Sequence, residues 1–80
     1  LALSKILNNI KTCYKKGITD VEALKETAYQ FLNDHHDLEY LEFMNEENLD
    51  EMTTADDHTR VFIACKVGGV RLIDNILLGE

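Results

Sequence analysis

The sequence predicts a two-layer α+β domain in which two N-terminal helices pack on a three-stranded antiparallel sheet. Three observations predict this fold class. Apolar residues follow helical spacing in two stretches of the first half, residues 3–14 and 21–32. A strand-like stretch follows at residues 38–44, and Gly68-Gly69 then joins two runs rich in Val, Ile and Leu, a pattern typical of a β-hairpin.

The first helix is expected over residues 1–16, a length of about 24 Å at 1.5 Å per residue. Its apolar residues recur three and four positions apart and therefore share one face: Leu3, Ile6, Leu7, Ile10, Cys13 and Tyr14. Lysines in the last turn suit the negative end of the helix dipole. Gly17 is placed to adopt the left-handed conformation that ends a helix.

A second helix is expected to start after only a tight turn, so the two helices should be roughly antiparallel. Thr19 and Glu22 have the spacing of a capping box, and Asp20 adds negative charge to the first turn. The apolar stripe of this helix consists of Val21, Leu24, Ala28, Phe31 and Leu32. The helix is expected to fray around residues 33–37.

Residues 38–44 predict a strand. Its alternating side chains place Leu41 and Phe43 on one side and Tyr40, Glu42 and Met44 on the other. Its two glutamates lower the strand propensity, so an edge position is expected. Asn45 is placed to cap a short helical turn that runs to Leu49. Residues 51–59 are polar, and we expect a loop of variable length and mobility.

The hairpin about Gly68-Gly69 fixes the pairing of its two strands, because two-residue turns need positive φ. The register places Val67 opposite Val70 and Phe62 opposite Asn75. One face of the hairpin carries Val61, Ile63, Cys65, Val67, Val70, Leu72 and Ile76, with Asp74 as its only polar side chain. The other face carries Arg60, Lys66, Arg71 and Asn75 among Phe62, Ala64, Ile73 and Leu77.

The apolar face of the hairpin is expected to pack against the helices. Asp74 on that face is expected to accept hydrogen bonds, because an unpaired buried carboxylate is costly. The other face mixes cations with apolar groups, so we expect it to meet a partner.

Lys66 and Arg71 face each other across the hairpin, and like charges there destabilise the pairing unless an anion lies near. One explanation is that Glu39 or Glu42 on the adjacent strand supplies the anion. The other is that the pair faces a nucleotide or an acidic patch of another domain. Arg71 and Lys66 are therefore the candidate domain-facing residues.

Eighty residues make one domain with a small core, and its stability should be on the order of 3–5 kcal/mol. The net charge of −7 argues against a nucleic-acid partner. Residues 1–16 hold four lysines and no acid, whereas residues 17–59 hold thirteen acids and one lysine. This asymmetry predicts either a basic helix beside acidic neighbours or simply solvated faces of opposite sign.

No catalytic or metal-binding residue is predicted. Adjacent histidines in Asp34-His35-His36-Asp37 would point about 100° apart on a helix, so a frayed polar helix end is favoured over a metal site. No serine or cysteine has a histidine and an acid at recognisable spacing, and no phosphate loop is present. Cys13 and Cys65 are expected to be buried thiols in a reducing cytoplasm, with a disulfide as the alternative.

The run from Ala64 to Asn75, and above all Arg71-Leu72-Ile73-Asp74-Asn75, resembles the closing segment of the pantothenate synthetase (pantoate–β-alanine ligase) family. Residues 38–42 and 45–49 resemble the same family's strand and turn, although the family usually has Asp-Pro where this chain has Asn45-Glu46. The chain also starts at Leu1, directly in an amphipathic pattern. We therefore expect residues 1–80 to be the C-terminal lid domain of a longer ligase whose N-terminal nucleotide-binding domain is absent.

The resemblance implies an enzyme that uses ATP and Mg²⁺ to activate pantoate as an acyl adenylate, which β-alanine attacks to give pantothenate. It implies a Rossmann-like N-terminal domain, a hinged C-terminal lid, and a cytoplasmic homodimer formed through the first domain. The family's catalytic and phosphate-binding motifs match nothing in this chain, so none of its residues is assigned such a role and the fragment alone is not expected to be active. The alternative is a free-standing acidic protein-interaction module that binds through the same mixed face.

Overall fold

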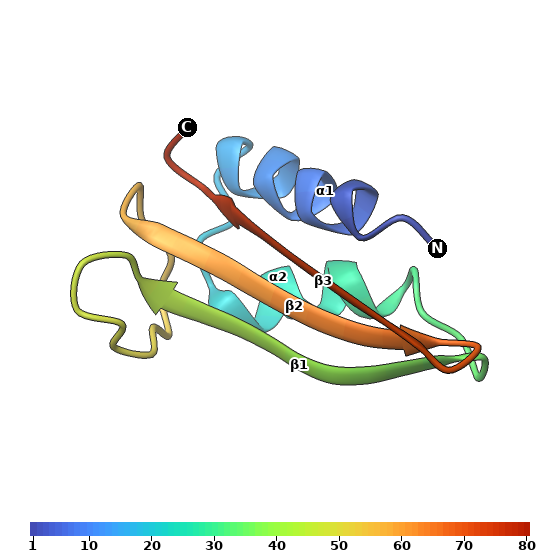
Figure 1. Ribbon diagram of the computed structural model, residues 1–80. Helices are drawn as coiled ribbons and strands as arrows, with labels where there is room; N and C mark the ends of the chain where they lie inside the picture. Colours follow the sequence, from blue (N-terminus) through green and yellow to red (C-terminus); the bar gives the residue numbers. More distant parts are fainter.

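The computed structural model describes all 80 residues and contains two helices followed by three strands (Figure 1). The elements are α1 (Leu3–Lys15), α2 (Val21–Tyr29), β1 (His36–Asn45), β2 (Thr59–Val67) and β3 (Val70–Leu77). The strands form one antiparallel sheet in the order β1-β2-β3. Both helices lie on the same side of this sheet, so the predicted two-layer α+β fold is confirmed.

The core lies between the helices and one face of the sheet. Fourteen buried residues form it, with contributions from both helices and from the sheet. In α1 the buried side chains are Leu3, Ile6, Leu7 and Ile10, as the helical spacing predicts. Gly17 ends α1 with φ of 110°, a conformation in which a side chain would be strained.

The start of α2 differs from the prediction by one residue. Asp20, not Thr19, is the N-cap, and its carboxylate accepts a hydrogen bond from the Ala23 amide at 3.1 Å. The Thr19 carbonyl instead accepts from the amide of Ala55 at 2.7 Å, because the loop before β2 runs beside this turn.

The end of α2 also differs from the prediction. The helix stops at Tyr29, so Phe31 falls outside its apolar stripe and is 42% exposed, whereas Leu32 packs against the core. His36 is not at a frayed helix end but begins β1, opposite Val67, and its Nδ1 accepts from the amide of Asn33 at 3.1 Å.

β1 occupies an edge of the sheet, as predicted, and buries Leu41 and Phe43 against the helices. It is longer than the predicted strand, and its pairing with β2 contains a bulge between Leu38 and Tyr40. The bulge leaves Glu39 without a partner in β2.

The hairpin of β2 and β3 has the predicted register from Val67–Val70 to Phe62–Asn75. Gly68 and Gly69 form its turn with φ of 57° and 82°. Val61, Ile63 and Cys65 of the central strand β2 are fully buried. Asp74 was expected on the buried face but is exposed, because β3 is an edge strand; its carboxylate accepts from the Asn75 amide at 2.8 Å.

Residues 51–58 form a loop, as predicted for residues 51–59, and Thr59 already begins β2. Main-chain bonds tie it to its surroundings, from the Met52 amide to the Phe43 carbonyl at 2.9 Å and from the Val21 amide to the Thr53 carbonyl at 3.1 Å. Ala55 within it is buried. The Asn45 side chain caps the first turn, as predicted, by accepting from the Glu47 amide at 2.9 Å.

Both cysteines are free thiols, so no disulfide is formed. Cys65 is fully buried, and burial raises the pKa of its thiol. Neither helix has the length and apolar character needed to cross a membrane.

Candidate functional site

The candidate site is the face of the sheet opposite the helices, which we call the open face. Its side chains come from all three strands: Tyr40, Glu42, Met44, Arg60, Phe62, Ala64, Lys66, Arg71, Ile73, Asn75 and Leu77. The mixture of cationic, apolar and amide groups is the one predicted for the hairpin. Neither helix covers this face.

Arg71 on β3 pairs with Glu39 on β1, with Nε 2.7 Å from Oε1. Because β2 lies between these strands, the two side chains reach across the central strand above the open face. The bulge supports this contact, since it releases Glu39 from direct pairing. The hydrogen bond to Glu39 raises the pKa of the Arg71 guanidinium. The first explanation considered for the like-charge pair therefore holds for Arg71.

Arg60 is held at the other end of the open face. Its Nε and Nη2 donate to Glu46 Oε1 at 3.0 and 2.5 Å, and its Nη1 donates to Asn75 Oδ1 at 2.7 Å. Sequence reasoning missed Glu46 as a partner, because it lies in the turn after β1, which folds back toward the start of β2.

Lys66 is exposed and makes no ion pair. The two predicted candidates therefore differ in their contacts. Arg71 is ion-paired with Glu39, whereas Lys66 has no carboxylate partner within this chain and its charge remains available to another domain or protein. Beside them Ile73 is 63% exposed, more than any other large apolar side chain. An exposed apolar side chain beside a cation is typical of a surface that contacts another protein surface rather than solvent alone.

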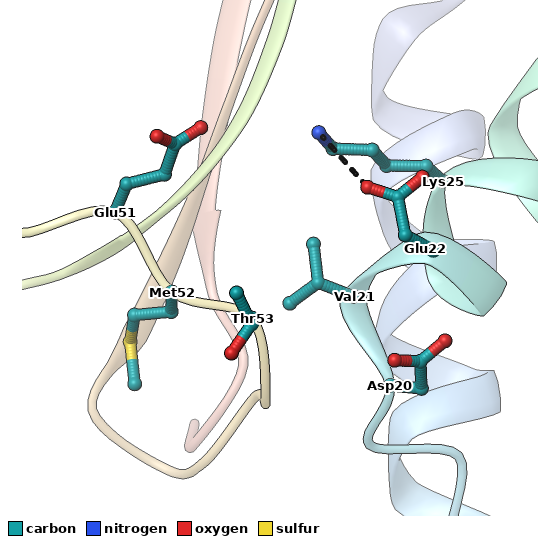
Figure 2. A pocket seen from close by; sticks show the side chains of 7 residues that line it. All are labelled: Asp20, Val21, Glu22, Lys25, Glu51, Met52 and Thr53. Atoms are coloured by element: carbon teal, nitrogen blue, oxygen red, sulfur yellow. Dashed lines mark ion pairs between the residues drawn. The ribbon is translucent and has the colours of Figure 1, made fainter.

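A hollow of about 280 Å³ lies between the start of α2 and the loop before β2 (Figure 2). Its lining residues are Asp20, Val21, Glu22, Lys25, Glu51, Met52 and Thr53. Glu22 pairs with Lys25 at 3.9 Å, and Asp20 is engaged as the helix cap. Figure 2 shows the side chain of Val21, at the start of α2, directed toward Thr53 of the loop. This hollow lies where the loop before β2 packs against the start of α2. Three of its four charged side chains, Asp20, Glu22 and Lys25, already have partners within the chain.

The lysines of α1 form no ion pair with the acidic segments. The one side-chain hydrogen bond between α1 and the acidic loop is from the Tyr14 hydroxyl to Asp57 Oδ1 at 2.6 Å. Of the two explanations of the charge asymmetry, solvated faces of opposite sign therefore fits better.

Comparisons with known proteins give one consistent result. The family model described as pantoate-beta-alanine ligase matches residues 1–77. The pantothenate synthetase of Geotalea uraniireducens is 40% identical over 100% of this chain and 29% of its own length. That of Pseudothermotoga lettingae is 37% identical with the same coverage.

Among solved structures, pantoate-beta-alanine (pantothenate synthetase) from Thermus thermophilus superposes with a TM-score of 0.79 and 24% identity. The superposition covers 98% of this chain and 29% of that one, and at this identity it shows a shared fold. The chain thus spans about 29% of the length of the curated relatives and aligns with their C-terminal part.

Proposed function

The chain belongs to the pantoate-beta-alanine ligase family, and we propose from this premise that residues 1–80 form the C-terminal lid domain of a longer enzyme. The reaction we propose for the full-length protein is the ATP-dependent condensation of pantoate with β-alanine to pantothenate, through pantoyl adenylate. The match over residues 1–77 carries this proposal. The alternative of a free-standing acidic interaction module finds no support in the reported relatives, which are all pantothenate synthetases.

ATP is a substrate in this proposal, and Mg²⁺ would accompany it. The residues of this chain do not fit either group. No three side chains among His, Cys, Asp and Glu converge to hold a metal ion, and Gly68-Gly69 is a hairpin turn rather than a phosphate loop. We therefore place the nucleotide in the N-terminal part of the full-length protein and derive no chemical step at residues 1–80.

The role left for this chain is to close over the site. A lid excludes water from a reactive, hydrolysable intermediate and opens to release product. The closely packed core between sheet and helices supports movement as one rigid unit. We propose that the open face turns toward the larger domain, since it carries the free cation Lys66 and the exposed Ile73.

Charge reversal on the open face tests this role in the full-length enzyme. Arg71→Glu would place a new carboxylate beside Glu39 and should raise the KM for ATP or lower kcat by about tenfold. Lys66→Glu should act in the same direction. Lys16→Glu, at the end of α1 on the other layer, is the matched control and should leave both constants unchanged. Unchanged kinetics in a well-folded Arg71→Glu enzyme would remove the open face from the site.

We propose in addition that the full-length protein is a cytoplasmic homodimer joined through its N-terminal domain. Light scattering during gel filtration tests the assembly: the full-length protein should be a dimer, and removal of residues 1–80 should leave it one. A monomer after that removal would place the dimer contact in this chain instead.

A further inference from the structure

The two outer edges of the sheet differ in how their backbone groups are satisfied. On β1 the segment after the strand covers the edge: the Phe43 carbonyl accepts from the Met52 amide at 2.9 Å, and the Asn45 amide donates to the Asp50 carbonyl at 2.8 Å. The part of the β1 edge from Phe43 to Asn45 is therefore closed to further strands, whereas the outward amide of Leu41 stays uncovered.

On β3 the edge is open. The hairpin register directs the amides of Val70, Leu72 and Asp74 toward β2, so those of Arg71 and Ile73 point outward. Neither outward amide has a main-chain partner among the turn and loop bonds. The next outward amide, of Asn75, is satisfied locally by the Asp74 carboxylate. Within residues 70–75 the unpaired outward amides are therefore those of Arg71 and Ile73.

A hollow of about 360 Å³ lies at this unpaired stretch. Leu1, Leu3 and Ser4 line one side of it, and residues 71–74 line the other. Two exposed apolar side chains lie at its rim, Leu1 at 44% and Ile73 at 63%, beside the polar side chains of Ser4, Arg71 and Asp74. In Figure 1 the N-terminus and the β2–β3 turn lie at the same end of the molecule.

The comparisons indicate what would lie in this hollow. Relatives are more than three times as long as this chain, which aligns with their C-terminal part, so in a protein of that length a long segment precedes Leu1. Ala2 is extended, with φ −107° and ψ 108°, and the chain therefore enters α1 directly beside residues 71–74. A segment tethered there has a high effective concentration at the open edge.

We propose that the segment immediately preceding Leu1 in the full-length protein docks along the outer edge of β3, covering Ile73 and pairing with the amides of Arg71 and Ile73. Addition of an extended segment to a free sheet edge combines main-chain bonds with apolar contacts. This inference rests on the proposed function, because it takes residues 1–80 as the C-terminal part of the ligase. It places the pivot of the lid at the β3 edge.

Amide hydrogen exchange in the full-length protein, resolved by residue, tests the docking. The Arg71 and Ile73 amides should show protection factors at least about tenfold higher than the Leu41 amide, which points outward from the uncovered part of β1 in the same molecule. Equal protection of the three amides would overturn the proposal. Protection that rises with protein concentration would also overturn it, because it would assign the edge to a second copy.

Substitution sharpens the test. Ile73→Asp should abolish the extra protection and make the segment before Leu1 more susceptible to protease. Leu49→Asp is the matched control, since Leu49 is 60% exposed but lies in the loop after β1, and it should change neither readout. The two proposals, docking of the preceding segment and the lid role, can be refuted independently of each other. If the Arg71 and Ile73 amides are unprotected but Arg71→Glu alters the kinetics, only the docking proposal is refuted. If these amides are protected but Arg71→Glu leaves the kinetics unchanged, only the lid role is refuted.

Discussion

The two faces of the sheet are built from alternating residues of the same strands, yet only one holds the fold together. On the helix side Val61, Ile63 and Cys65 of β2 are fully buried. On the open face Lys66 and Ile73 are exposed. Apolar burial is the main source of folding free energy, so the difference in cover assigns stability to one face and leaves the other free for a partner.

The charges of the open face also indicate that this face is suited to a partner rather than to stabilising the fold. Arg71–Glu39 and Arg60–Glu46 are partly exposed ion pairs, and solvent screens the attraction in such pairs. They fix the positions of long side chains without adding much to stability. A surface that is ordered in this way but contributes little to folding is suited to recognition.

The largest expected effect compares two isoleucines on neighbouring strands. Ile63→Ala should lower the free energy of unfolding by about 2–5 kcal/mol, because it leaves a cavity in the core. Ile73→Ala should change it by no more than about 0.5 kcal/mol, because the side chain already faces water. Urea denaturation of both variants measures the two values. Equal losses of unfolding free energy in the two variants would show that the open face also stabilises the fold.

The hairpin is the part of the fold that the sequence predicts best. Gly68-Gly69 restricts the turn to one geometry, and a two-residue turn leaves a single register that the structure confirms residue by residue. The face assignments of Leu41 and Phe43 follow from alternation alone, and the structure confirms them too.

The errors lie where tertiary contacts decide between local alternatives. Asp20 and Thr19 are both good caps, and the choice depends on the loop residue Ala55 bonding to the Thr19 carbonyl. The polar sequence of the same loop predicts a loop, but it does not reveal the main-chain bonds that join this loop to β1 and α2. Glu39 was considered as a partner of Arg71, but the bulge that frees it has no local signature.

A smaller effect compares two carboxylates, one in each layer. Asp20→Ala removes the cap of α2 and should cost about 1 kcal/mol of unfolding free energy. Glu39→Gln on the open face should cost less, since the pair it weakens is partly exposed. Thr19→Ala is the control for the cap and should cost less than Asp20→Ala. The reverse order in thermal or urea unfolding would restore the capping-box assignment.

The smallest effect concerns the seam between α1 and the loop before β2. The hydrogen bond from Tyr14 to Asp57 raises the pKa of Tyr14 from 10.0 to about 12. Between these values the unfolded chain loses the phenolic proton while the folded chain keeps it, so stability falls as pH rises through this window. Tyr14→Phe should show a shallower fall in the free energy of unfolding than the parent protein over this pH range. Identical profiles for the parent and Tyr14→Phe would contradict the contact.

The most direct test of the division between the two faces is the rate at which an amine-reactive reagent labels individual lysines of the full-length enzyme. Lys66 lies on the open face and Lys16 at the end of α1, and neither makes an ion pair. With ATP and pantoate present, labelling of Lys66 should slow several-fold while Lys16 reacts at its former rate. An unchanged rate at Lys66, or slowing confined to the lysines of α1, would show that the open face does not close over the site.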